Sequence, residues 1–193
     1  DNKHEVILHK NDRFVGTGHN STLLEDDEKN TWMLYHAFEL ERLDAQRQVL
    51  LDRILWDEDG WPYVDKLEPS YGAFRPVIKK EEGKVEEEKP VTVLSKTVPL
   101  ADPYILVHDS LYYIYGTNVG TGFDVYYSKD LEYWERASAL SLSHANSYGE
   151  SMFWAPEVYY VEKDKKFYMF YSTEEHICVA TADSPLGPFK QDE

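Results

Sequence analysis

Two acidic residues adjoin prolines at the starts of expected strands and could carry acid–base chemistry. Asp102 lies in Ala101-Asp-Pro-Tyr-Ile, and Glu157 lies in Phe153-Trp-Ala-Pro-Glu-Val. A proline fixes the backbone beside the acid and donates no N–H group, which helps to aim the carboxylate. Glycoside hydrolysis commonly uses two carboxylates, one to protonate the leaving oxygen and one to activate water or attack the sugar carbon. The alternative is that Asp102 and its proline simply initiate a turn.

A glycine-containing segment, Gly16-Thr-Gly-His-Asn-Ser, leaves His19 and Asn20 projecting from a sharp turn. A lone histidine is either a structural hydrogen-bonding group or a ligand. No second His, Cys or acid stands at zinc-ligand spacing from His19, so the sequence does not support a transition-metal site. Residues 116–122 are also rich in glycine, but no helix is expected to follow them, which favours a hairpin connection over a phosphate loop.

These candidate residues are distributed over three stretches with a common order of elements. Each stretch, at residues 20–56, 103–134 and 156–189, has a short apolar strand, a polar turn, an aromatic strand and a further strand before a closing Trp or Phe. The repeat suits four-stranded propeller blades. We therefore predict an all-β fold with about three blade equivalents, whereas a closed ring needs at least about four.

Composition limits the function classes. The chain has 20 Lys and Arg against 36 Asp and Glu, a formal net charge of -16, which disfavours nucleic acid as a partner. No apolar run is long enough for a membrane span. The aromatic share of 15% supplies flat surfaces for sugar rings. Cys178, the one cysteine, is expected to be a buried structural thiol.

The chain is predicted to divide into three parts. Residues 1–78 would be one blade portion, residues 79–97 an acidic linker or exposed loop, and residues 98–193 two further blades. The linker assignment rests on the charged run at 79–90, which has one Val and no aromatic residue.

At these motifs the chain resembles glycoside hydrolase family 43. The segment 101–106 is similar to the family's opening strand, the segment 153–158 to its second-blade signature, and the segment 180–189 to the close of that blade. The segments 16–21, 50–56 and 60–62 resemble the family's last blade. The resemblance implies a five-bladed β-propeller that is partial or permuted, with the last-blade portion before the first-blade portion. It also implies an inverting hydrolase of arabinan or xylan polysaccharides or their oligosaccharides, secreted or periplasmic.

The resemblance also implies roles for single residues. Asp102 would be the general base that activates water, and His19 would lie near the axis, where a calcium ion is held through water, the one cofactor expected. The residues that would bind substrate are Trp154, Glu157, Asn20 and Phe153. The family's proton donor, a Glu in a Glu-Gly-Pro-like motif, and the Asp that tunes its pKa have no counterpart motif in these residues.

Several interpretations of this order remain open. The middle blades would follow Glu193 and precede Asp1, so a tandem junction, a rearranged chain and a half propeller completed by a complementary chain all fit. The open sheet flanks would need a covering partner or further blades. The functional alternatives are a carbohydrate-binding propeller without catalysis, in which Trp154 and tyrosines stack on sugars, and an assembly module.

Overall fold

The computed structural model describes residues 6–72, 75–77 and 93–191 of the 193-residue chain. These residues form antiparallel β-sheets with only three short 3-10 turns. The first sheet has the order β1-β3-β4-β5, with β2 paired to β3. Its strands are β1 (Phe14–Asn20), β2 (Leu24–Glu25), β3 (Thr31–Glu39), β4 (Gln48–Trp56) and β5 (Pro62–Val64).

The middle sheet has the order β6-β11-β10-β8-β7, and the third sheet has the order β13-β14-β15. The middle strands are β6 (Val93–Ser95), β7 (Ala101–His108), β8 (Leu111–Thr117), β10 (Val125–Ser128) and β11 (Trp134–Arg136). The third sheet comprises β13 (Trp154–Val161), β14 (Lys166–Thr173) and β15 (His176–Ala182). A small pair joins β9 (Gly122–Phe123) to β12 (Leu142–Ser143), and the 3-10 turns are η1 (Leu40–Arg42), η2 (Asp65–Leu67) and η3 (His144–Asn146).

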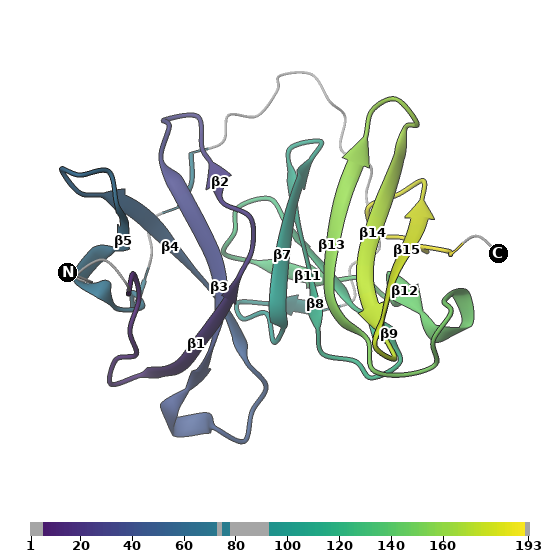
Figure 1. The fold of residues 1–193 in the computed structure, drawn as a ribbon, viewed down its shortest axis with the longest axis horizontal. Helices are drawn as coiled ribbons and strands as arrows, with labels where there is room; N and C mark the ends of the chain where they lie inside the picture. Colours follow the sequence, from purple (N-terminus) through teal and green to yellow (C-terminus); the bar gives the residue numbers. More distant parts are fainter. Residues whose placement is uncertain (1–5, 73–74, 78–92, 192–193) are drawn as a thin grey trace.

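The sheets stand side by side like propeller blades, with β7 of the middle sheet between β1 and β3 on one side and β13 on the other (Figure 1). The all-β prediction with about three blade equivalents is therefore confirmed. The polar turn expected in each stretch is also confirmed, since residues 26–30, 108–110 and 164–166 connect β2 to β3, β7 to β8 and β13 to β14.

Successive side chains of the middle strands point alternately to the two faces of the sheet and so contribute to two cores. In β8, Tyr113 and Tyr115 face the third sheet and pack with Val158 and Met169. Their neighbours in the same strand contribute to a second core against the first sheet, together with Leu34 of β3. Because side chains alternate between faces with a period of two, a strand that is buried on both sides reads as a nearly continuous apolar run. The aromatic segment 111–115 has this pattern.

Residues 93–95 correct part of the predicted linker. They form β6, which pairs with the edge of β11 through Leu94 opposite Glu135. The physical reason is that β11 would otherwise present unpaired backbone groups at the outer edge of the middle sheet. The rest of the predicted linker, at 79–92, lies outside the described residues.

The third sheet has one apolar face in the core and one toward solvent. Directly opposite residues on neighbouring strands share a face, and Phe170 stands opposite both Glu157 and Val179. On this outer face Phe170 is 44%, Val179 41% and Ile177 90% exposed. This is one of the flanks for which we predicted a covering partner or further blades.

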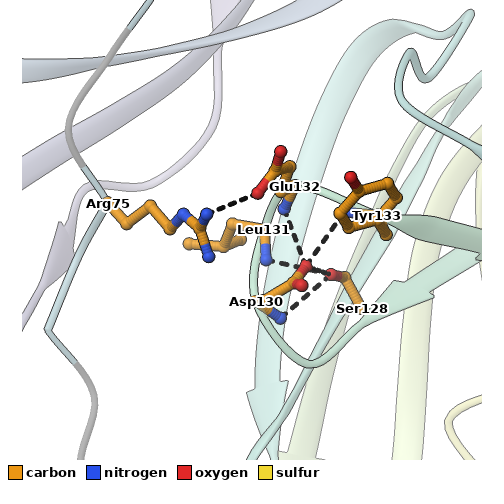
Figure 2. A network of polar contacts seen from close by, with 6 residues as sticks. All are labelled: Arg75, Ser128, Asp130, Leu131, Glu132 and Tyr133. Carbon is orange, nitrogen blue, oxygen red and sulfur yellow. Dashed lines mark hydrogen bonds and ion pairs between the residues drawn. The ribbon is translucent and has the colours of Figure 1, made fainter.

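A polar network fixes the turn between β10 and β11 (Figure 2). The carboxylate of Asp130 accepts hydrogen bonds from the backbone N–H groups of Glu132 and Tyr133, both at 2.9 Å. The Ser128 hydroxyl accepts bonds from the N–H groups of Asp130 and Leu131. Burial acts to raise the pKa of Asp130, but the bonds from Tyr133 and Glu132, a bond donated by the Ser128 hydroxyl and the charge of Arg75 outweigh it and lower the pKa. Arg75, which follows the first sheet in the chain, also pairs with Glu132 and so ties that segment to the middle sheet.

A second buried carboxylate, Asp26, organises the turn between β2 and β3. It is 2% exposed and accepts hydrogen bonds from the Trp32 indole at 2.9 Å, the Asn30 backbone at 2.8 Å and the Val77 backbone at 3.1 Å. Burial acts to raise its pKa, but the bonds from Asn30, Trp32 and Val77 together lower the pKa well below its ordinary value.

Replacing Asp26 is expected to destabilise the fold in a pH-dependent way. Asp26→Ala should lower the free energy of unfolding at pH 7 by about 3 kcal/mol, because it leaves buried donors without an acceptor. The folded pKa is depressed, so this stabilisation is present above the unfolded carboxyl pKa of about 4 and is lost as pH falls through the lower folded value. Urea unfolding at pH 7 and pH 3 measures both effects, with exposed Glu28→Ala as control. A difference from wild type that grows on acidification would contradict the assignment.

Candidate functional site

The innermost strand of each sheet is interrupted by a β-bulge or register shift near one end. The interruptions fall between Gly18 and Asn20 in β1, between Ala101 and Tyr104 in β7, and between Trp154 and Glu157 in β13. Bulges concentrate near active sites, where they redirect a side chain.

Each interruption contains a residue other than glycine in the left-handed region. The φ angles are 27° for His19, 47° for Asp102 and 48° for Ala155. Such conformations persist only where the surrounding structure holds them, and they are enriched at functional sites. Proline follows both Asp102 and Ala155, and because proline has no N–H group the interruption sacrifices no ladder hydrogen bond there.

Asp102 is held from both neighbouring sheets and remains 25% exposed. The Thr117 hydroxyl of β8 donates to Oδ2 of Asp102 at 2.8 Å, and the backbone N–H of Ala155 in turn donates to the Thr117 hydroxyl at 2.9 Å. The backbone N–H of Asp102 donates to Nδ1 of His36 in β3 at 3.0 Å. The first sheet therefore holds the backbone of Asp102, and the third sheet is linked to its carboxylate through Thr117.

The second carboxylate oxygen of Asp102 faces two imidazoles. Nδ1 of His19 lies 3.8 Å and Nδ1 of His36 3.9 Å from Oδ1, both beyond hydrogen-bond distance. The two rings are nearly parallel, 13° apart, with centroids separated by 6.4 Å. Burial is the main cause that lowers the pKa of His36, and the charge of Arg47 lowers it further against the opposing effect of Asp102.

A cavity of about 350 Å³ adjoins Asp102. Ala101 and Thr117, the chain neighbour and the hydrogen-bond partner of Asp102, both line it. Trp154, 40% exposed, and Arg47 line it as well, and the Arg47 guanidinium lies 5.1 Å from the ring centroid of Phe38. An aromatic wall beside a partly exposed carboxylate suits a ligand with an apolar face and polar edges.

A larger cavity of about 530 Å³ lies elsewhere, along the core between the first and middle sheets, where Leu34, Ile114 and Trp134 line it. Asp102 itself lines neither cavity, but its chain neighbour Ala101 and its hydrogen-bond partner Thr117 line only the smaller one. We therefore place the candidate site at the smaller one.

The surroundings of the other substrate-binding candidates differ from those of Trp154. Phe153 lines the smaller cavity, but it is 1% exposed and packs its ring against Phe123 and Tyr171, so it offers little surface for stacking on a sugar. Glu157 is exposed, and its carboxylate accepts a hydrogen bond from the Tyr159 hydroxyl at 2.7 Å. Asn20 is exposed, and its amide donates to the Ser21 carbonyl at 2.9 Å.

The surroundings of His19 do not by themselves form a calcium site. Calcium takes six to eight oxygen ligands, whereas one carboxylate and an imidazole meet here. Within the described part of the chain, no group of three or more His, Cys, Asp or Glu residues could hold a metal ion. The calcium ion held through water near His19 stays a prediction.

The sequence analysis missed His36 and Thr117. His36 is 7% exposed inside the apolar run of β3, and a buried histidine among apolar residues was the only available signal. Thr117 ends the aromatic strand β8, and nothing in its local sequence indicates contact with Asp102.

Comparisons with known proteins agree on one family. The sequence profile of glycosyl hydrolases family 43 matches residues 1–62 and 93–192. The extracellular exo-α-(1→5)-L-arabinofuranosidase of Cellvibrio japonicus (strain Ueda107) is 35% identical over 63 residues, which are 33% of this chain and 17% of that protein. This chain therefore spans a small part of the length of that relative.

Solved structures match over about half of the chain. An endo-1,4-β-xylanase from Bacteroides thetaiotaomicron VPI-5482 is 54% identical, with a TM-score of 0.46, over 49% of this chain and 33% of its own. An endo-arabinase from the same strain is 32% identical, with a TM-score of 0.44, over 53% of this chain and 38% of its own. Within the described residues, no helix has the length and apolar character needed to cross a membrane.

Proposed function

Because the chain belongs to glycosyl hydrolase family 43, we propose that the complete protein is an inverting glycosidase of arabinan or xylan polysaccharides and their oligosaccharides, with Asp102 as the general base. The observation that carries this proposal is the placement of Asp102. Its carboxylate is held at Oδ2 by Thr117, is partly exposed and adjoins a cavity with an aromatic wall. Secretion is part of the proposal, since the arabinofuranosidase that the chain resembles is extracellular.

In the proposed reaction, Asp102 acts on a water molecule. Oδ1 accepts a proton from the water as the water oxygen bonds to the anomeric carbon, and the bond to the leaving oxygen breaks with protonation by a general acid. Inversion needs the two carboxyl groups about 6.5–9.5 Å apart, so that the water fits between base and sugar. We expect that acid from outside these 193 residues.

The stereochemical outcome tests the mechanism directly. The complete protein is incubated with aryl arabinofuranoside and aryl xyloside substrates, and proton NMR records the first anomer released. Inversion is expected, and release of the retained anomer would exclude a base that activates water. Binding of arabinan or xylan without any hydrolysis would instead favour the carbohydrate-binding alternative.

Trp154 is expected to contribute to substrate binding. Trp154→Ala should raise KM about 10-fold with a smaller effect on kcat, because stacking on an aromatic face stabilises bound substrate and transition state alike. Tyr133→Ala is the matched control, since Tyr133 has a similar exposure of 39% but does not line the cavity. Steady-state kinetics of both variants measure the effect, and equal KM values would remove Trp154 from the site.

A further inference from the structure

We propose that His36 is a positioning residue for Asp102, acting through a hydrogen bond to the backbone rather than to the carboxylate. This inference rests on the proposed function, in which Asp102 is the base. His36 lies in β3 of the first sheet, and Asp102 lies in β7 of the middle sheet, so the contact crosses between blades.

The central contact is the N–H···N hydrogen bond from Asp102 to Nδ1 of His36, at 3.0 Å. Because Nδ1 accepts a hydrogen bond here, the imidazole is neutral and carries its own proton on Nε2. The bulge between Ala101 and Tyr104 removes Asp102 from the regular ladder with β8. His36 therefore supplies the acceptor that a ladder carbonyl supplies elsewhere in the strand.

Gly18 of β1 leaves room for the imidazole ring of His36. A Cβ atom added at Gly18 would lie 3.2 Å from Nε2 of His36, so the absence of a side chain at position 18 lets the ring sit against β1. His36 is 7% exposed, and the ring of His19 lies nearly parallel to it with centroids 6.4 Å apart. A buried ring in a close-fitting position has little freedom to turn.

Two independent anchors then define the direction of the carboxylate. His36 holds the backbone N–H of Asp102, and Thr117 holds Oδ2. Asp102 has a φ of 47°, a conformation that its surroundings must hold. Without the His36 anchor, the backbone of Asp102 can relax and the base moves away from its reactive position. A displacement of about 1 Å can lower a rate about 100-fold.

The test compares two substitutions of His36 in the complete protein. His36→Phe keeps a flat ring but removes the acceptor, whereas His36→Asn places Oδ1 close to the former position of Nδ1 and keeps it. We expect His36→Phe to lower kcat about 30-fold with KM changed less than 3-fold. His36→Asn should lower kcat by no more than about 5-fold, because it keeps an acceptor for the backbone N–H group. Equal losses in both variants, or a loss of less than 2-fold in His36→Phe, would overturn the inference.

Asp102→Asn, assayed in parallel, distinguishes a failure of the proposed function from a failure of the positioning role of His36. If Asp102→Asn keeps full activity, the proposed function fails; if it is inactive while His36→Phe is unaffected, the positioning role alone fails. A measurement on the unmutated complete protein covers the case in which His36→Phe does not fold. A scalar coupling across the hydrogen bond between the Asp102 amide nitrogen and Nδ1 of His36, measured by NMR in a 15N-labelled sample, is expected. A folded sample without this coupling, in which His36 carries its proton on Nδ1, would overturn the inference.

Discussion

Asp102→Asn is expected to reduce kcat/KM of the complete protein toward arabinoside and xyloside substrates by about 10³-fold. General-base catalysis contributes about 10²- to 10⁴-fold, and an amide in place of the carboxylate cannot accept the proton of the attacking water. The substitution keeps the size of the side chain, and its carbonyl oxygen can still accept the hydrogen bond from Thr117. The melting temperature should therefore change by no more than about 2 °C, which corresponds to about 0.5–1 kcal/mol for a domain of this size.

Asp109→Asn provides the matched control for this prediction. Asp109 lies in the hairpin turn that follows β7, its side chain is 59% exposed, and it also has a positive φ of 50°. The same chemical change there should leave kcat/KM within 2-fold of wild type. Hydrolysis assays and differential scanning calorimetry of both variants measure the result. Full activity in Asp102→Asn would remove the general base from the proposed mechanism.

Gly116→Ala is expected to destabilise the fold strongly. A Cβ atom at position 116 would lie 2.5 Å from the carbonyl oxygen of Ala101 and 2.9 Å from Cβ of Leu100. Both neighbours belong to the backbone or the base of a buried side chain, so β7 and β8 must move apart. Overpacking of this kind costs about 3 kcal/mol. Because Ala101 directly precedes Asp102, activity should fall as well.

Gly120→Ala tests whether the effect comes from this close approach. No atom lies within 4 Å of a Cβ added at Gly120, in the connection after the same strand. Urea unfolding should therefore show a change of less than about 0.5 kcal/mol for Gly120→Ala. If both variants lost the same stability, the close packing of Gly116 against Ala101 would not be the cause.

The fold could be predicted to a large extent because its main determinants are local. Aromatic strands such as 111–115 alternate between two buried faces, and polar pairs such as Asp109 and Ser110 mark the turns between them. β6 was missed because its position depends on the free edge of β11, far along the chain from residues 93–95.

The site could be predicted only in part because its contacts are long-range. Asp102 was identified from the proline that follows it. His36 is separated from Asp102 by much of the chain, and only the packing of β3 beside β7 brings them together. Phe153 lines the cavity, but its ring is 1% exposed and packs in the core, which its motif did not indicate. A motif locates a segment at the site but does not decide which of its side chains point inward.

The shared backbone interruption of β7 and β13 has a consequence for engineering. Asp102 and Ala155 have nearly the same φ, each stands just before a proline, and each lies within a register shift at the start of the inner strand of its sheet. The same local backbone conformation therefore carries a carboxylate in β7 and a methyl group in β13. Position 155 is accordingly where we would introduce a second polar side chain, because the backbone there already has the bend that Asp102 uses.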